Sequence, residues 1–319
     1  MNKEHIPLVE KYRPKKLNDI IGNKNEIDFL KIFLKNNHIP NLILEGDPGT
    51  GKTSAIFAFV NEYLGDLYET NCLELNASDD RGIEIVRSKI KTFSQKKIDK
   101  HKIIILDEAD NMTSSAQFAL RRTMEQFDEN TRFLFTCNNI ENIIDAIQSR
   151  CIILNFGKIP INEIEERIWN ICKNENIMIT KKGISVMIEL YDNRNDVRGI
   201  INLLELINAN FYGKRIDDHK ICEICDKPSP KIIRKIILHI KEKNLMQAVN
   251  LVIELKKEGF SNVDICTILY CEILNYFPKN IVLKMYEIIG DYNKLFLEGY
   301  ENILQLSDLI IKLESVVES

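Results

Sequence analysis

The feature that most constrains this chain is a glycine-rich run, GDPGTGKT, at residues 46–53. It follows a predicted buried strand at residues 41–45 and precedes an amphipathic helix predicted at residues 54–64. In that setting, glycines let backbone N–H groups curl around phosphate oxygens at the amino end of a helix. A purely structural glycine-rich turn is the alternative, but the flanking strand and helix favour a nucleotide phosphate site.

The side chains of this loop have separate predicted roles. Lys52 supplies a positive charge to the outer phosphates, and Thr53 offers a hydroxyl to Mg²⁺. Glycines and neighbouring residues provide backbone contacts. The nucleotide contacts expected from this part of the chain are Asp47, Pro48, Gly49, Thr50, Gly51, Lys52, Thr53 and Ser54.

A second apolar run, at residues 103–106, ends in the acidic pair Asp107 and Glu108. Parallel strands end at one edge of a sheet, so this pair is expected beside the phosphate loop. Asp107 would then hold Mg²⁺ through its water shell, and Glu108 would orient the attacking water. An apolar strand followed by acids is common, so this assignment depends on the phosphate loop.

The chain of 319 residues exceeds the usual size of one domain. Up to about residue 156, apolar runs alternate with amphipathic stretches, which predicts a parallel α/β sheet. Beyond residue 158 the periodicity is helical, and the prolines at 228 and 230 exclude a continuous helix there. We predict three domains, at residues 1–157, 158–225 and 226–319, with strands at residues 42–44, 73–75, 103–106, 133–136 and 152–154.

Composition and charge restrict the function classes. With 45% hydrophobic and 28% charged residues, the chain is an ordinary globular protein. It has no apolar run long enough for a membrane span and no signal-like N-terminus, so we expect an intracellular protein. A net charge of −4 argues against coating nucleic acid by bulk attraction. A basic strip at residues 81–102 fits either regional contact with DNA phosphates or a solvated helix.

The eight cysteines do not form an obvious framework, and we expect them to be reduced. His219, Cys222 and Cys225 have a spacing found among metal ligands. A structural zinc site needs four ligands and no second pair is apparent, so a helix with buried sulfurs is favoured.

Four further segments carry a specific resemblance: LVEKYRP at residues 8–14, LELNASDDRG at 73–82, ALRRTME at 119–125 and SRC at 149–151. These resemble the replication factor C small subunits, and the similarity extends over nearly the full length. Residues 226–228 and 298–305 are most similar to the eukaryotic subunit numbered two in animals, although subunit naming differs between organisms. The resemblance implies an α/β AAA+ P-loop domain, a small helical lid domain and an all-α C-terminal collar domain.

The resemblance also implies roles for residues outside the two motifs. Tyr12 and Arg13 lie beside the adenine and phosphates of bound ATP in this family. Asn138 matches the first sensor, an amide that helps to place the hydrolytic water. Arg198 matches the second sensor, on a helix that we expect Asp196 to cap. Without the resemblance, Asn138 reads as a turn residue and Arg198 as a solvated charge.

Arg150 matches the arginine finger, which acts in trans at the nucleotide of a neighbouring subunit. Taken alone, it would be an ordinary surface arginine. Two positions depart from the family pattern. Asp47 replaces a usual proline and Asn195 a usual glycine, so a modestly reduced nucleotide affinity is expected.

The resemblance implies a nuclear ATPase that loads a sliding clamp onto primed DNA. Its expected partners are other replication factor C subunits in a hetero-pentamer, the clamp, and primer–template DNA. Residues 112–122 are expected near the clamp, and the DNA contacts expected from the basic strip are Arg81, Arg87 and Lys89.

Two alternatives remain. One is another AAA+ motor, such as a branch-migration helicase, against which the segments at residues 10–14 and 149–151 argue. The other is a scaffold subunit that binds ATP and donates Arg150 without hydrolysing. The intact Thr53, Asp107 and Glu108 argue against that alternative.

Overall fold

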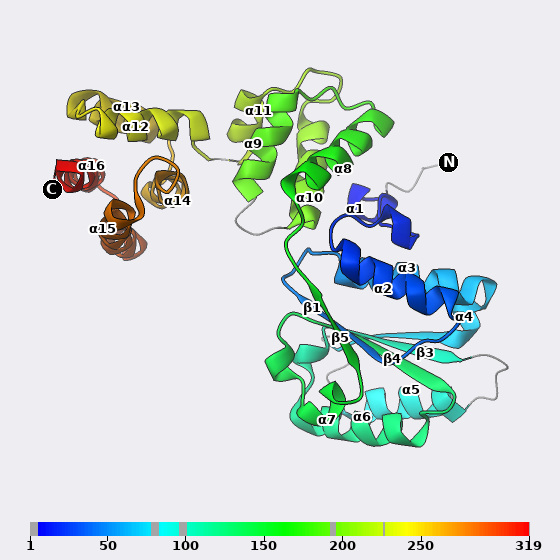
Figure 1. The fold of residues 1–319 in the computed structure, drawn as a ribbon. Coiled ribbons are helices and arrows are strands. Elements are labelled where there is room, and N and C mark those ends of the chain that lie inside the picture. Colours follow the sequence, from blue (N-terminus) through cyan, green and yellow to red (C-terminus); the bar gives the residue numbers. More distant parts are fainter. Residues whose placement is uncertain (1–5, 78–82, 96–100, 192–195, 226, 319) are drawn as a thin grey trace. The chain divides into compact units, whose positions relative to one another are not determined.

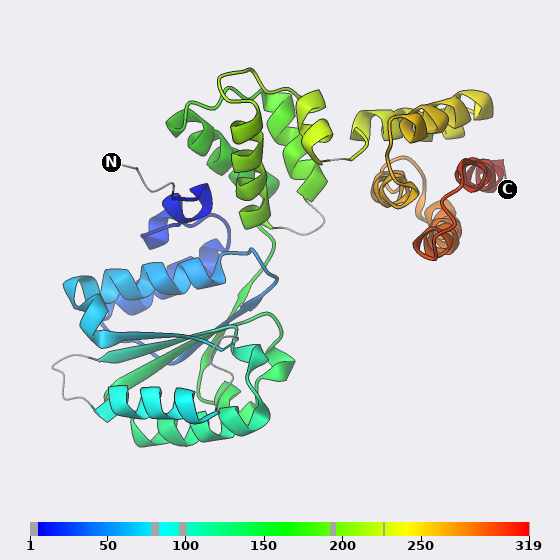
Figure 2. The same ribbon diagram turned by 180° about the vertical axis from the view of Figure 1, so that it is seen from behind.

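A computed structural model describes residues 6–77, 83–95, 101–191, 196–225 and 227–318. The chain forms two compact units. The first consists of Met1–Ile177 and Met187–Gly213, and the second of Met178–Val186 and Lys214–Ser319. Figure 1 shows the fold of each unit, and Figure 2 shows the same ribbons from behind.

A parallel sheet forms the centre of the first unit, with the strand order β2-β3-β4-β1-β5. All five predicted strands are present. Each extends beyond the apolar run that predicted it, because the residues that flank the run, most of them polar, also join the hydrogen-bonded ladder. The strands are β1 Leu42–Gly46, β2 Cys72–Asn76, β3 Lys102–Asp107, β4 Thr131–Cys137 and β5 Ile152–Phe156.

Helices cover both faces of this sheet (Figure 1). The helices α2 Lys24–Lys35 and α3 Lys52–Leu64 pack on one face. The other face is covered by α5 Ile83–Gln95, α6 Ser114–Gln126 and α7 Asp145–Gln148. Successive side chains along a strand pack on opposite faces of the sheet, so Leu42 and Leu44 belong to one core and Ile43 belongs to the other. Burial on both faces explains why the strands are continuous apolar runs.

Short elements and two long helices complete the first unit. Among them, α1 Leu8–Lys11 is tied to α10 Val197–Asn210 by the Leu8 N–H, which donates to Glu205 Oε2 at 3.1 Å. Helix α8 Ile161–Asn174 begins where the strand pattern ends. The division between the units falls within α9 Lys181–Tyr191. The short elements are η1 Leu17–Asp19, η2 Gly65–Leu67, α4 Tyr68–Asn71, η3 Ala109–Asn111 and η4 Ile140–Asn142.

The second unit is helical apart from one bridge between Ile179 and Ile216. Its core includes Ile233, Ile236, Ile237 and Ile240, which recur at helical spacing on α12 Pro230–Lys241. Helix α11 ends at Cys225 and α12 begins at Pro230, so the prolines interrupt the helix as predicted. The helices are α11 Asp218–Cys225, α12 Pro230–Lys241, α13 Leu245–Lys257, α14 Asn262–Ile273, α15 Lys279–Leu297 and α16 Ile303–Glu318.

All eight cysteines are free thiols. Cys222 is buried on α11, and Cys225 at the end of that helix is half-buried. Within the described ranges, no three His, Cys, Asp or Glu side chains group in a way that could hold a metal ion. Among the described helices, none has the length and apolar character of a membrane span.

Candidate active site

The phosphate loop connects the end of β1 to the start of α3. Gly49 has a φ of +83° and Gly51 a φ of +93°, a region that side-chain-bearing residues rarely adopt. At Gly46, an added Cβ would lie 2.1 Å from the carbonyl oxygen of Phe156. At Gly51, it would meet nothing within 4 Å, so this glycine faces open space. The backbone can therefore approach a phosphate group closely at the amino end of α3.

Lys52 lies enclosed by acceptors of the loop. Its Nζ donates to the carbonyl oxygens of Gly46 at 2.6 Å and Asp47 at 2.9 Å, and to Asn138 Oδ1 at 3.0 Å. The side chain is 7% exposed. Burial lowers the pKa of Lys52, and nearby acidic groups, including Asp107, oppose that shift. The structure thus places this cation at the carboxyl edge of the sheet, beside Asn138.

Other loop residues occupy different environments. Asp47 and Pro48 are exposed, so the Asp47 side chain faces solvent. Thr50 is buried, and its hydroxyl donates to the carbonyl oxygen of Asp47 at 2.8 Å. That bond is internal to the loop and stabilises its turn. Ser54 lines the same pocket as Lys52 and Thr53.

The acidic pair at the end of β3 is held by one hydroxyl of β4. Thr136 Oγ1 donates to Asp107 Oδ1 and accepts from the Glu108 N–H at 3.0 Å. Thr53 Oγ1 also donates to Asp107 Oδ1, at 3.0 Å. Glu108 has a φ of +53°, uncommon for a residue with a side chain, and its Oε2 accepts from Asn111 Nδ2 at 3.2 Å. Hydroxyl and carboxylate oxygens so close together are the hard ligands that Mg²⁺ prefers.

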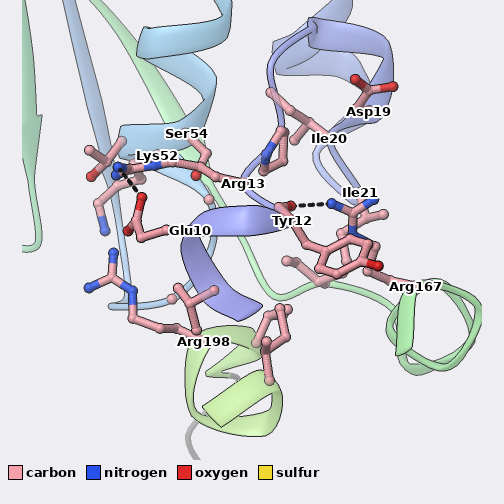
Figure 3. A pocket seen from close by; sticks show the side chains of 18 residues that line it. Glu10, Tyr12, Arg13, Asp19, Ile20, Ile21, Lys52, Ser54, Arg167 and Arg198 are labelled. Carbon is pink, nitrogen blue, oxygen red and sulfur yellow. Dashed lines mark hydrogen bonds and ion pairs between the residues drawn. The ribbon is translucent and has the colours of Figure 1, made fainter. Parts of the chain in front are cut away.

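A pocket extends from the phosphate loop to residues 9–21, called here the N-terminal arm, and to helices α8 and α10 (Figure 3). The lining includes Tyr12, Arg13 and Arg198, so the structure brings these predicted residues together with Lys52. The Tyr12 hydroxyl donates to Glu175 Oε1 at 2.5 Å. Burial, together with this bond, raises the pKa of Tyr12 to about 12.

Arginines approach the pocket from different sides. The Arg13 guanidinium lies 5.0 Å from the centre of the Phe57 ring and pairs with Glu10 Oε2 at 3.2 Å. Arg198, near the start of α10, is exposed (Figure 3). Arg167 of α8 donates to the Tyr12 carbonyl oxygen and so ties the N-terminal arm to that helix.

Arg150 lies at the amino ends of the strands (the amino edge of the sheet), whereas the phosphate loop lies at their carboxyl ends (the carboxyl edge). It precedes β5, whose first residue Ile152 pairs with Leu42, the first residue of β1. The loop begins at Gly46, the last residue of β1, so the strand separates the two by about 13 Å at about 3.3 Å per residue. The Arg150 side chain is 38% exposed, and its Nη2 pairs with Glu125 Oε1 at 2.6 Å.

Some predicted residues fall outside the described part of the chain. These are Arg81, the side chain of Arg87, and Asn195. Lys89 is described, and it is exposed on α5. In the segment expected near a clamp, residues 112–122, Phe118 is 52% exposed on α6.

The expectation that Asp196 caps α10 is wrong. Asp196 occupies the position before the helix, but its side chain makes no capping hydrogen bond. Instead it packs against the phosphate loop, where a Cβ on Gly49 would lie 2.6 Å from Asp196 Oδ1. Packing against Gly49 thus takes the place of the capping bond. Gly49 is needed there both for its φ and for the space beside Asp196.

Sequence reasoning missed several residues that shape the site. Asp110 follows the acidic pair in the sequence, where it was given no role, and its Oδ2 accepts from the Asn138 N–H at 3.0 Å. Thr136 and Arg167 looked like an ordinary strand residue and an ordinary helix residue. No signal in the sequence distinguishes them, because their partners come from distant segments.

Comparisons with known proteins extend over both units. The family model of the "ATPase family associated with various cellular activities (AAA)" matches residues 42–157. The "Replication factor C C-terminal domain" model matches residues 228–312. The two models match different parts of the chain, and the residues matched by the first include the phosphate loop and the acidic pair.

Curated relatives match over nearly the whole chain. Replication factor C subunit 4 of Schizosaccharomyces pombe is 40% identical over 97% of this chain and 91% of its own length. Replication factor C subunit 2 of Arabidopsis thaliana is 38% identical over 98% and 94%. The replication factor C small subunit of Sulfurisphaera tokodaii is 36% identical over 97% and 95%. Subunit numbers two and four both occur among these relatives.

Solved structures show the same fold at lower identity. The RuvB Holliday junction branch migration motor of Thermotoga maritima aligns with a TM-score of 0.57 at 17% identity. The alignment covers 71% of this chain and 79% of that one. At this identity the likeness shows the fold alone.

Proposed function

The chain belongs to the replication factor C small-subunit family of AAA ATPases, and from this membership we propose that it is an ATP-hydrolysing subunit of a clamp loader. Such a machine places a sliding clamp on primed DNA. Membership of this family separates the chain from branch-migration motors, with which it shares a fold at 17% identity. It also implies other replication factor C subunits as partners.

The observation that carries this proposal is the convergence of four side chains at the carboxyl edge of the sheet. Lys52 contacts Asn138 at 3.0 Å, and Thr53 contacts Asp107 at 3.0 Å. These contacts join the phosphate loop to the ends of β3 and β4. A nucleotide phosphate seated on the loop would therefore meet a cation, an amide and two oxygen ligands at once.

The chemistry proposed at this site is cleavage of ATP by water. Lys52 and the loop N–H groups hold the outer phosphates. Mg²⁺, when bound, neutralises phosphate charge, and Thr53 and Asp107 are the residues that would hold it, Asp107 partly through water. Glu108 orients the attacking water and accepts its proton, while Asn138 helps to place that water. ADP and phosphate are the products.

The pocket residues of Figure 3 have binding roles in this proposal. Tyr12, Arg13 and Arg198 line this pocket. Tyr12 and Arg13 would contact the adenine and phosphates, and Arg198 would approach the phosphates from α10. The exposed Asp47 carboxylate adds negative charge near the site, so a modestly weaker affinity is retained as part of the proposal.

Arg150 is proposed to act at the site of a neighbouring subunit. Its position at the amino edge of the sheet, away from its own phosphate loop, supports that role. A finger supplied in trans stabilises charge on the transferring phosphoryl group, so hydrolysis depends on assembly.

We further propose the three domains at residues 1–157, 158–225 and 226–319, as AAA+ domain, lid and collar. The family models at residues 42–157 and 228–312 support the first and the last. The proposed partners are a hetero-pentamer of subunits, the clamp near residues 112–122, and primer–template DNA along Arg81, Arg87 and Lys89. The proposed location is the nucleus, supported by eukaryotic relatives.

Reconstitution with the partner subunits tests this function. The assembled complex is expected to hydrolyse ATP faster when clamp and primed DNA are added together, and to load the clamp. A complex carrying Glu108→Gln in this subunit should bind ATP but load more slowly. If Glu108→Gln and Lys52→Ala complexes hydrolyse and load like the parent, this chain is a scaffold rather than an active ATPase subunit.

A further inference from the structure

The segment that carries Asn138 begins where strand pairing ends. The last pair of β4 with β3 is Phe135 with Leu106, and the last pair with β1 is Cys137 with Glu45. Backbone N–H groups beyond these pairs cannot be satisfied by the ladder and need other acceptors. The direction of the Asn138 side chain is therefore set by side-chain acceptors rather than by the backbone ladder.

Two carboxylates supply those acceptors. Asp110 Oδ2 accepts from the N–H groups of Asn138 at 3.0 Å and Asn139 at 3.3 Å. Glu45 Oε1 accepts from the Ile140 N–H at 3.3 Å. These carboxylates also lie near Cys137, where burial is the main cause that raises the pKa of the thiol to about 12. The turn after β4 is thus held by Glu45 of β1 and by Asp110 of η3.

The next residues close the turn. The Asn139 side chain accepts from the Glu141 N–H at 2.9 Å at the start of η4. With the backbone held in this way, the Asn138 side chain reaches the phosphate loop, and its Oδ1 accepts from Lys52 Nζ. Because the amide oxygen is directed at Lys52, the amide N–H groups remain as donors for a water or a phosphate oxygen.

Asp110 differs from Glu45 in one respect. Its second oxygen, Oδ1, is buried and has no hydrogen-bond partner among the described residues. The Asp110 carboxylate is therefore held among the described residues by the two backbone N–H contacts of Oδ2. The Asp110 charge also acts favourably on the Lys52 ammonium. The carboxylate therefore acts both on the turn after β4 and on Lys52.

We propose that Asp110 is a positioning residue for ATP hydrolysis, which holds the Asn138–Asn139 backbone and so aims the Asn138 amide at the phosphate loop. Asp110 touches neither the nucleotide nor the water in this account. The inference rests on the proposed role of Asn138 in hydrolysis. It assigns a function to Asp110, beyond the roles proposed for Asp107 and Glu108.

Three variants in this subunit of the assembled complex test the inference: Asp110→Ala, Asp110→Asn and Asn138→Ala. The contribution of this site is isolated by subtracting the turnover of a complex that carries Lys52→Ala here. Asp110→Ala is expected to slow single-turnover hydrolysis by about tenfold, while ATP affinity changes by less than about threefold. Asp110→Asn, which keeps an acceptor for the two N–H groups, should recover most of the rate.

A double-mutant cycle gives the sharper result. If Asp110 works by aiming Asn138, Asp110→Ala should add little in the Asn138→Ala background. Hydrogen exchange should also rise in the peptide containing residues 138 and 139 in Asp110→Ala. Glu141→Ala, which removes an exposed carboxylate from the same turn, is the matched control and should change neither rate nor exchange.

The outcomes separate this inference from the proposed function. If Asn138→Ala slows hydrolysis but Asp110→Ala does not, or if their losses multiply in full, the inference fails and the proposed function stands. A loss of ATP affinity as large as the loss of rate in Asp110→Ala also overturns it. If Asn138→Ala hydrolyses normally, the sensor role fails and the inference fails with it.

Discussion

The two edges of the parallel sheet in the first unit differ in what they carry. At the carboxyl edge, where the strands end, hydrogen bonds join the phosphate loop to Asp107 and to Asn138. A further hydrogen bond joins Asn138 to Asp110. At the amino edge, Arg150 pairs with Glu125 and is 38% exposed. The first arrangement is complete within the chain, whereas Arg150 has no phosphate site beside it. We propose that the carboxyl edge works on the chain's own nucleotide and that Arg150 acts on a nucleotide bound to a neighbouring subunit.

The largest effect is expected at the carboxyl edge, from Lys52→Ala. It removes the buried cation aimed at the outer phosphates, and a charge-assisted bond of about 3 kcal/mol corresponds to roughly a hundredfold in ATP affinity. Hydrolysis at this site should be abolished, which the ATP turnover measures. Nucleotide titration gives the affinity, and thermal unfolding shows whether the fold is kept. Lys31→Ala is the control, since Lys31 pairs with Asp28 on the surface of α2. Unchanged affinity and turnover would remove Lys52 from the site.

Glu108→Gln should separate binding from cleavage at the same edge. An amide can hydrogen-bond a water but is a poor base, so hydrolysis should fall by about 10²–10⁴-fold with ATP still bound. Single-turnover hydrolysis in the assembled complex measures this. A normal single-turnover rate would mean that another group activates the water.

Thr136→Val tests whether one hydroxyl holds both acids. Valine keeps the shape but loses the bonds to Asp107 and to the Glu108 N–H. We expect a loss of about tenfold in hydrolysis, or about 1.4 kcal/mol, and a higher Mg²⁺ requirement, because Asp107 loses its orientation. Thr136→Ser keeps the hydroxyl and is the matched control. Equal rates in the Val and Ser variants would show that the acids are held without Thr136.

The smallest effect is expected from the basic strip. Replacing Arg81, Arg87 and Lys89 together by Ala should weaken binding to primed DNA about equally across sequences. It should also reduce the salt slope by up to about three, since each lost phosphate contact reduces it by about one. Binding titrations at several salt concentrations measure this. Replacing Lys24, Lys31 and Lys35 of α2 removes the same charge and is the control. A slope equal to that of the parent would mean that the strip only faces solvent.

The sequence predicted those features that depend on neighbours along the chain. The strands around the sheet were visible because burial on both faces makes each one a continuous apolar run. The phosphate loop was visible because its glycines are needed at a strand-to-helix turn. Both signals are local, so no knowledge of packing was required.

Residues whose partners lie far away in sequence could not be predicted in the same way. Thr136 meets Asp107 from the neighbouring strand, and Arg167 meets Tyr12 across more than a hundred residues. Asp196 was wrongly expected to cap α10 because its position fits that role, whereas packing against Gly49 decided its orientation. Local preference is a weak guide wherever tertiary contact offers a competing partner.

The division between the two edges is tested most directly by combining Arg150→Ala in this chain with a phosphate-loop lysine substitution in each partner subunit, one at a time. Nucleotide binding to this chain should remain nearly intact, and hydrolysis at one neighbour should fall on the order of a thousandfold. Disabling that neighbour's own site should then add little further loss of total ATP turnover, while disabling any other site should add its full share. Additive losses with every partner, or a defect confined to this chain's own pocket, would contradict a trans role for Arg150.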